Sequence, residues 1–158
     1  MPVVGVRGRP IDGAFGHPPM LRRTIMTRPH SPPLHLEIPA RAEELASVRR
    51  RFSEWLALAG VGAELAADIL LVVNEACSNS IEHAYLGRTP GVVRLSADHE
   101  SDGICLTIED FGQWRGGATD ADVSRGRGLP LVRALSTRVD LSTSDRGTRL
   151  SMSFPAPT

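Results

Sequence analysis

The sequence contains no lysine, so all 18 of its basic residues are arginine. A P-loop nucleotide site needs the lysine of its Gly-Lys-Ser/Thr motif, and a eukaryotic-type protein kinase needs a lysine on a strand beside ATP. Both classes of ATP site are therefore excluded. The sequence also lacks an excess of either charge, because 18 acidic residues balance the arginines. The net charge thus gives no reason to expect nucleic acid or a membrane surface as a direct partner.

Cysteine and long hydrophobic runs are scarce as well. Cys77 and Cys105 lie inside apolar segments without the spacing of a metal site, so we expect two reduced thiols in the core. No stretch approaches the roughly 18 apolar residues of a membrane span, and the N-terminus lacks the apolar segment of a secretory signal. We therefore expect a cytoplasmic protein that has no membrane partner.

A change of composition near residue 33 divides the chain. Residues 1–33 are rich in proline, glycine and arginine and show no hydrophobic period, which predicts a disordered tail. Met20 and Met26 are alternative starts, so part of this tail is a candidate artefact of the assigned start codon. Residues 34–155 have the length of one domain with a substantial core.

Hydrophobic periodicity over residues 34–155 predicts both strands and helices. We expect strands at residues 35–39, 92–97, 104–110, 138–143 and 147–154, and helices at residues 41–58, 63–86 and 128–136. Each strand has one apolar face, which is typical of a mostly antiparallel mixed sheet covered by helices on one side. The predicted fold class is α/β (α+β), a two-layer sandwich. In the longest helix the predicted buried stripe is Leu70, Val73, Cys77, Ile81 and Ala84.

Two polar side chains share one face of the predicted helix at residues 63–86. Glu75 and Asn79 are four residues apart, so they project from the same side. A carboxylate and a carboxamide in this arrangement can orient a hydroxyl group and supply an oxygen ligand to Mg²⁺. The same pair is common on solvated helix surfaces, so it indicates no function by itself.

Three glycine-containing segments follow along the chain. Asp110, which precedes Phe111-Gly112, shares the apolar face of its strand; its carboxylate can accept a hydrogen bond from an exocyclic amine such as adenine N6, or can cap the turn. Gly126-Arg127-Gly128-Leu129 opens a helix, where backbone N–H groups can approach a phosphate. Thr148 follows Gly147 on the core-facing side of the last strand.

In this order the four segments resemble the N, G1, G2 and G3 boxes of the GHKL (Bergerat-fold) ATPases. The sequences NEACSNSIEHAY and GRGLPLVRALS resemble in particular the anti-sigma-factor serine kinases of the RsbW and SpoIIAB type. The resemblance covers roughly residues 34–155 and implies an ATP lid at residues 113–125. It departs from the family at Gln113-Trp114, where a further glycine is usual. His83 and Tyr85 also match, and we expect a structural role for both.

The resemblance assigns a role to each matching residue of the nucleotide site. It implies that Glu75 is the catalytic base and that Asn79 is the ligand of Mg²⁺. It implies that Asp110 anchors the adenine of ATP, with Gly112 beside it and with Thr148 supporting it through a water.

On the phosphate side, the resemblance implies a wall formed by Gly126, Gly128 and Leu129. An arginine near the γ-phosphate is expected in the family. Arg125 and Arg127 are both candidates, and the alignment in this segment does not choose between them.

The resemblance implies an ATP- and Mg²⁺-dependent protein serine/threonine kinase. Such a kinase phosphorylates a serine of an anti-anti-sigma (STAS-domain) protein and sequesters a sigma factor, as a homodimer without direct contact to nucleic acid. The alternative is a nucleotide-dependent regulatory module with little or no kinase activity; the presence of both Glu75 and Asn79 favours the kinase. A histidine kinase or chaperone core is disfavoured, because no phosphoacceptor-histidine helix pair or transducer domain fits into the remaining residues.

Overall fold

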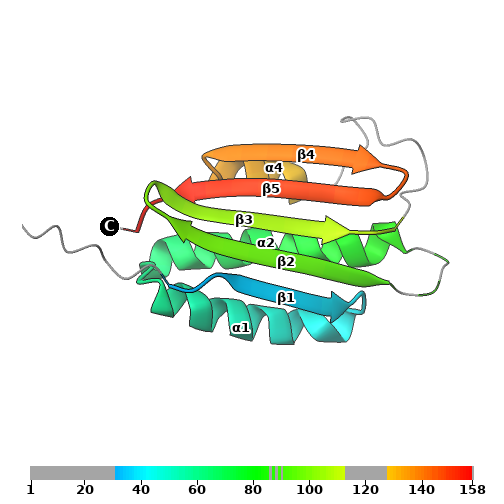
Figure 1. Ribbon diagram of the computed structural model, residues 1–158, viewed down its shortest axis with the longest axis horizontal. Coiled ribbons are helices and arrows are strands. Elements are labelled where there is room, and N and C mark those ends of the chain that lie inside the picture. Colours follow the sequence, from blue (N-terminus) through cyan, green and yellow to red (C-terminus); the bar gives the residue numbers. More distant parts are fainter. Residues whose placement is uncertain (1–30, 86, 88, 90, 113–127, 158) are drawn as a thin grey trace, which may run out of the picture.

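The computed structural model describes residues 31–85, 87, 89, 91–112 and 128–157, which form one sheet backed by helices (Figure 1). The strands are β1 (Leu34–Pro39), β2 (Val92–Glu100), β3 (Gly103–Asp110), β4 (Arg138–Ser144) and β5 (Gly147–Pro155). The α-helices are α1 (Leu45–Leu58), α2 (Ala63–Ala84) and α4 (Gly128–Leu135), and a single 3-10 turn (Ala42–Glu44) precedes α1. The predicted α+β sandwich is therefore confirmed.

The five strands lie in the order β1-β2-β3-β5-β4, and each neighbouring pair is antiparallel. A mostly antiparallel mixed sheet is the prediction from sequence; in the described part of the chain the sheet has no parallel pair. The reason lies in the connections. Two pairs are joined by tight turns, and α1 and α2 form a hairpin between β1 and β2. This hairpin returns the chain to the end where β1 finished, so that Pro39 pairs with Val92.

The helical hairpin turns at a glycine. Gly60 has a φ of +71°, a left-handed conformation that glycine adopts without steric cost. The N–H of Val61 then donates to the carbonyl oxygen of Leu56 at 3.0 Å, which satisfies one of the free carbonyls at the end of α1. This turn sets α2 against the middle of the sheet, where it contacts both α1 and α4.

The core lies between the helices and one face of the sheet. On α1, Phe52 and Trp55 stack with ring centroids 5.6 Å apart and are almost completely buried. The sheet contributes alternate residues of its inner strands, which are Val93, Leu95, Ala97, Ile104, Leu106, Ile108, Met152 and Phe154. This alternation is the period of two that the strand assignments rest on. Among the described helices, none is long and apolar enough to cross a membrane.

The domain makes contacts before β1. Ser31 is buried, and the indole Nε1 of Trp55 donates a hydrogen bond to the carbonyl oxygen of Pro32 at 2.7 Å. Pro32, which belongs to the predicted tail, thus contacts α1. The rest of that prediction, residues 1–30, lies outside the described residues.

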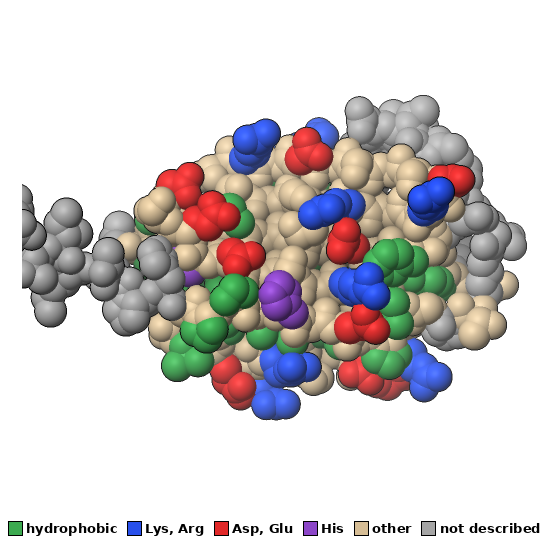
Figure 2. Space-filling model, in the orientation of Figure 1, with side chains coloured by type: hydrophobic (Ala, Val, Ile, Leu, Met, Phe, Trp, Pro, Cys, Tyr) green, Lys and Arg blue, Asp and Glu red, His purple; other side chains and the backbone are tan. Residues whose placement is uncertain are grey.

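The face of the sheet that points away from the helices carries charged side chains and is exposed to solvent (Figure 2). Glu37, Arg94, Glu109 and Arg149 form a row across β1, β2, β3 and β5 in the strand register. The charges alternate along this row, with N···O distances of 2.7 Å for Arg94–Glu37 and 3.6 Å for Arg149–Glu109. Such exposed pairs contribute only about 0–1 kcal/mol each, so the row makes this face compatible with water rather than holding the fold together.

Candidate functional site

Helix α2 places Glu75 and Asn79 on the flank that faces α4. Both side chains are half-buried, while the opposite side of α2 is buried in the core. Gly128, the first residue of α4, packs directly against them. A Cβ atom built on Gly128 would lie 2.7 Å from Cγ and 2.8 Å from Oε1 of Glu75, and it would overlap Nδ2 of Asn79. With a larger residue at this position, the side chains of Glu75 and Asn79 would have to move away from the start of α4.

The start of α4 also places free backbone N–H groups beside these two side chains. The first backbone N–H groups of a helix have no partner within the helix, and they carry the positive end of its dipole. Because Gly128 touches Glu75 and Asn79, these donors lie next to a carboxylate and a carboxamide. This combination suits a phosphate group together with its metal ion.

Asp110 is held at the end of β3 by backbone groups. Its side chain is 2% exposed, and its Oδ1 accepts hydrogen bonds from the amide of Thr148 at 3.2 Å and from the amide of Gly112 at 3.4 Å. The register also pairs Asp110 with Thr148 across β3 and β5. The hydroxyl group of Thr148 is buried and has no hydrogen-bond partner among the described residues. A ligand or a water bound beside Asp110 would satisfy this hydroxyl.

Two glycines let the backbone approach closely around Asp110. A Cβ atom on Gly112 would overlap the carbonyl group of Ala84, the last residue of α2. Gly147 has a φ of +129°, and a Cβ atom there would come within 2.8 Å of Cα of Phe111. The end of β3, the start of β5 and the C-terminal end of α2 therefore meet at one place.

Tyr85 ties the same corner together. Its hydroxyl donates to the carbonyl oxygen of Val92 at 2.7 Å and accepts a hydrogen bond from the amide of Phe111 at 3.0 Å. Its ring lies against Gly91, where a Cβ atom would overlap it. Tyr85 thus has the structural role expected of it, whereas His83 is exposed.

The predicted site residues in the described part of the chain form two clusters along α2. Glu75, Asn79 and Gly128 make up the first cluster, and Asp110, Gly112 and Thr148 make up the second. The second cluster meets α2 at Ala84, five residues beyond Asn79, which is about 7.5 Å along a helix.

Four of the predicted residues have a different status. Leu129 is 5% exposed and belongs to the core, so only its backbone is available to a ligand. Arg125, Gly126 and Arg127, together with the lid expected at residues 113–125, lie outside the described residues.

Gly91 and Gly147 are not among the predicted site residues. The signal for Gly147 is the dipeptide that it forms with Thr148; Gly91 has no such signal.

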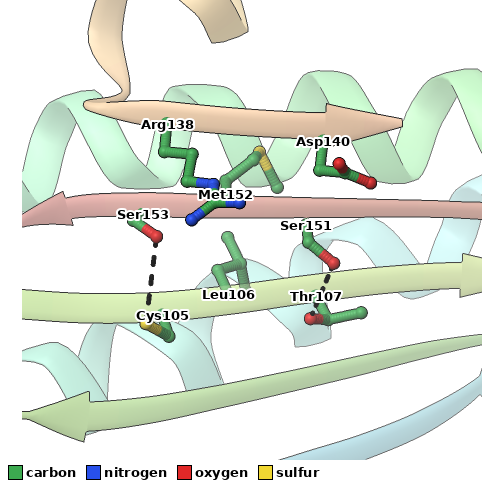
Figure 3. A pocket seen from close by; sticks show the side chains of 8 residues that line it. All are labelled: Cys105, Leu106, Thr107, Arg138, Asp140, Ser151, Met152 and Ser153. Atoms are coloured by element: carbon green, nitrogen blue, oxygen red, sulfur yellow. Dashed lines mark hydrogen bonds between the residues drawn. The ribbon is translucent and has the colours of Figure 1, made fainter. Parts of the chain in front are cut away.

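A hollow of about 260 Å³ lies elsewhere, on the open face of the sheet (Figure 3). Its lining residues are Cys105, Leu106, Thr107, Arg138, Asp140, Ser151, Met152 and Ser153. None of them belongs to either cluster.

Burial raises the pKa of the Cys105 thiol, and it raises the pKa of the Cys77 thiol to about 12. Both thiols are therefore protonated at neutral pH and are poor nucleophiles.

Comparison with known proteins agrees with the fold. The sequence model of the histidine kinase-like ATPase domain family matches residues 38–154. The structure of the RsbU and RsbW domains of Rv1364c from Mycobacterium tuberculosis is similar with a TM-score of 0.63 and 27% identity over 80% of this chain. The blue-light activated histidine kinase EL346 from Erythrobacter litoralis is similar with a TM-score of 0.54 and 26% identity over 75% of this chain. The match spans 34% and 42% of those two chains.

Proposed function

This chain belongs to the histidine kinase-like ATPase domain family, and we propose that it is a serine kinase that uses Mg·ATP to phosphorylate a regulatory protein. The observation that carries the proposal is the contact of Gly128 with both Glu75 and Asn79. It brings a candidate base, a candidate metal ligand and the start of a helix to one point, as phosphoryl transfer requires.

The adenine of ATP would bind at the cluster around Asp110. Two backbone amides orient the carboxylate of Asp110, so that it can accept a hydrogen bond from the exocyclic amine of adenine. The buried hydroxyl of Thr148 offers a further polar group at the same place. The fit is chemical as well as geometric, because guanine carries an oxygen where adenine has its amine.

The phosphates and Mg²⁺ would lie at the cluster around Gly128. The described residues contain no group of three or more His, Cys, Asp and Glu side chains that could hold a metal ion. Mg²⁺ does not need a group of this kind, because it is often held by one or two protein oxygens together with substrate phosphates. Asn79 would supply the protein oxygen, and bound Mg²⁺ would neutralise the charge of the phosphates.

Glu75 would act on the acceptor. Its carboxylate would take the proton of a serine hydroxyl as the oxygen forms its bond to the γ-phosphorus. The bond between the γ-phosphorus and the bridging oxygen then breaks, and ADP leaves with that oxygen. A positioned base of this kind accelerates a reaction by about 10²–10⁴-fold.

The similarity to a structure that contains an RsbW domain supports a regulatory role for the kinase. The kinase would act as a homodimer. Its acceptor would be a STAS-domain anti-anti-sigma protein, and its second binding partner would be a sigma factor. The use of ATP supports a cytoplasmic location. A regulatory module without kinase activity is the competing function.

The test is a transfer assay with radiolabelled ATP and the STAS-domain proteins of the same genome. We expect label on a serine of one of them, and a Glu75→Gln variant as control should give almost none. ATP binding without labelling of any STAS-domain protein would contradict the kinase and support the regulatory module.

A further inference from the structure

The exposed leucine of α2 is the feature that the nucleotide site leaves unused. Leu58, Leu71 and Phe111 are the exposed large hydrophobic residues in the described part of the chain, with 77%, 49% and 45% exposure. The ring of Phe111 packs under the guanidinium of Arg94 at 4.8 Å. Leu58 is the last residue of α1, where the helix ends. Leu71 lies within α2, with a helical turn on each side.

Leu71 shares the outward face of α2 with Glu75. The two residues are four apart, so they are neighbours on the helix surface. Farther along the same face, Ser78 donates a hydrogen bond to Glu82 at 3.1 Å. Among the exposed residues of α2, all of which the structure describes, Leu71 is the only large apolar one. A single exposed leucine is ordinary on a protein surface, so the position of Leu71 beside Glu75, and not its exposure alone, distinguishes it from Leu58.

The order of groups along α2 indicates the side from which the acceptor would approach Glu75. The adenine cluster meets α2 at Ala84, the phosphate cluster meets it at Asn79, and Glu75 comes next. Leu71 is one turn beyond Glu75, about 6 Å farther along the axis. Since the nucleotide would occupy the side toward Ala84, an acceptor hydroxyl would reach Glu75 from the side of Leu71.

We propose that Leu71 is the docking residue for the protein that carries the acceptor serine. This proposal rests on the proposed kinase function. The occupant is a folded protein that presents an apolar side chain close to its serine, because the serine must reach Glu75 while its neighbour covers Leu71. Covering Leu71 also keeps water away from Glu75, which favours transfer over hydrolysis.

The experiment compares Leu71→Ser with Leu58→Ser, a control at a more exposed leucine outside the site. Both variants and the wild type are assayed with the STAS-domain acceptor that the wild type labels, over a range of acceptor concentrations. For Leu71→Ser we expect KM for the acceptor to rise about tenfold, the effect of losing one leucine contact, while kcat falls much less. We expect Leu71→Met to restore KM and Leu58→Ser to match the wild type.

Each other outcome overturns the docking role. An unchanged KM in Leu71→Ser would show that the acceptor does not touch this residue. An equal loss of ATP affinity would assign Leu71 to the nucleotide site instead. A change of sedimentation mass in Leu71→Ser would show that a second copy of the chain covers it. If the wild type labels no acceptor, the proposed kinase function itself fails and the docking role fails with it; if the wild type transfers normally and Leu71→Ser does too, only the docking role fails.

Discussion

The backbone amide of Thr148 donates a hydrogen bond to Oδ1 of Asp110, with an N···O distance of 3.2 Å. This bond connects the start of β5 to the end of β3 through a buried carboxylate. It fixes the orientation of the carboxylate without using the hydroxyl of Thr148, which is buried beside it and has no partner among the described residues. Positioning and ligand binding can therefore be separated by mutation.

Asp110→Asn should lose adenine recognition and keep the fold. The asparagine retains an oxygen for the amide of Thr148, but its NH₂ group cannot accept a hydrogen bond from adenine. We expect ATP affinity to fall by about 1.5–3 kcal/mol, the value of a hydrogen bond to a charged group. Calorimetry with ATP and GTP measures the effect, with Asp140→Asn on the exposed face of β4 as control. Equal affinity of the wild type for the two nucleotides would show that Asp110 does not read the base.

Thr148→Val should separate stability from binding. Valine has nearly the same shape, keeps the backbone bond to Asp110 and removes a buried hydroxyl that has no partner within the described part of the chain. We expect the melting temperature to stay the same or rise, because an unsatisfied polar group costs about 1–3 kcal/mol. ATP affinity should fall several-fold through loss of the polar contact. Thr143→Val, at the exposed register partner of Thr148, is the control. A lower melting temperature with unchanged ATP affinity would contradict this account.

Gly128→Ala should damage the phosphate cluster. The added methyl group would overlap the side chains of Glu75 and Asn79, and overpacking of this kind costs about 1–3 kcal/mol. We expect a lower melting temperature together with at least tenfold weaker binding of ATP. The control is Gly62→Ala, where a Cβ atom would meet nothing within 4 Å and φ is −62°. Similar effects of the two substitutions would show that the close contact at Gly128 has no special role.

Removal of residues 31–33 should destabilise the domain. A chain that begins at Leu34 lacks the carbonyl oxygen of Pro32, so the buried Nε1 of Trp55 loses its acceptor. The cost of about 1 kcal/mol corresponds to a melting temperature lower by about 4 °C. A chain that begins at Ser31 keeps this contact and should melt like the full chain. Equal melting temperatures of the two truncated chains would show that the contact contributes nothing.

The sequence predicts the elements well and the packing of α2 only in part. Val73, Cys77 and Ala84 of the predicted stripe are fully buried, whereas Leu70 and Ile81 lie at its edges. The buried face is wider than one stripe and also includes Ile69, Val72, Ala76 and Ser80. The physical reason is that α2 packs against the sheet, α1 and α4 at once, and a single period cannot indicate how many neighbours a helix has.

The site shows the same limit. Helical spacing places Glu75 beside Asn79, and strand parity places Asp110 on the buried face, so both features follow from local geometry. The contact of Gly128 with α2 and the bond between the amide of Thr148 and Asp110 join segments that are far apart in the chain. No local period encodes these contacts; they follow from the order of the strands and from the glycines that permit close approach.

The measurement that tests the kinase most directly is phosphoryl transfer by Glu75→Gln and Asn79→Ala, with an ATP titration of each variant. Glu75→Gln should lose about 10²–10⁴-fold in transfer to the STAS-domain acceptor and bind Mg·ATP almost as the wild type does, because the base contacts the acceptor. Asn79→Ala should lose Mg·ATP binding and phosphoryl transfer together, because the side chain of Asn79 would hold Mg²⁺. If Glu75→Gln transfers as fast as the wild type, Glu75 is not the base and the central claim is wrong.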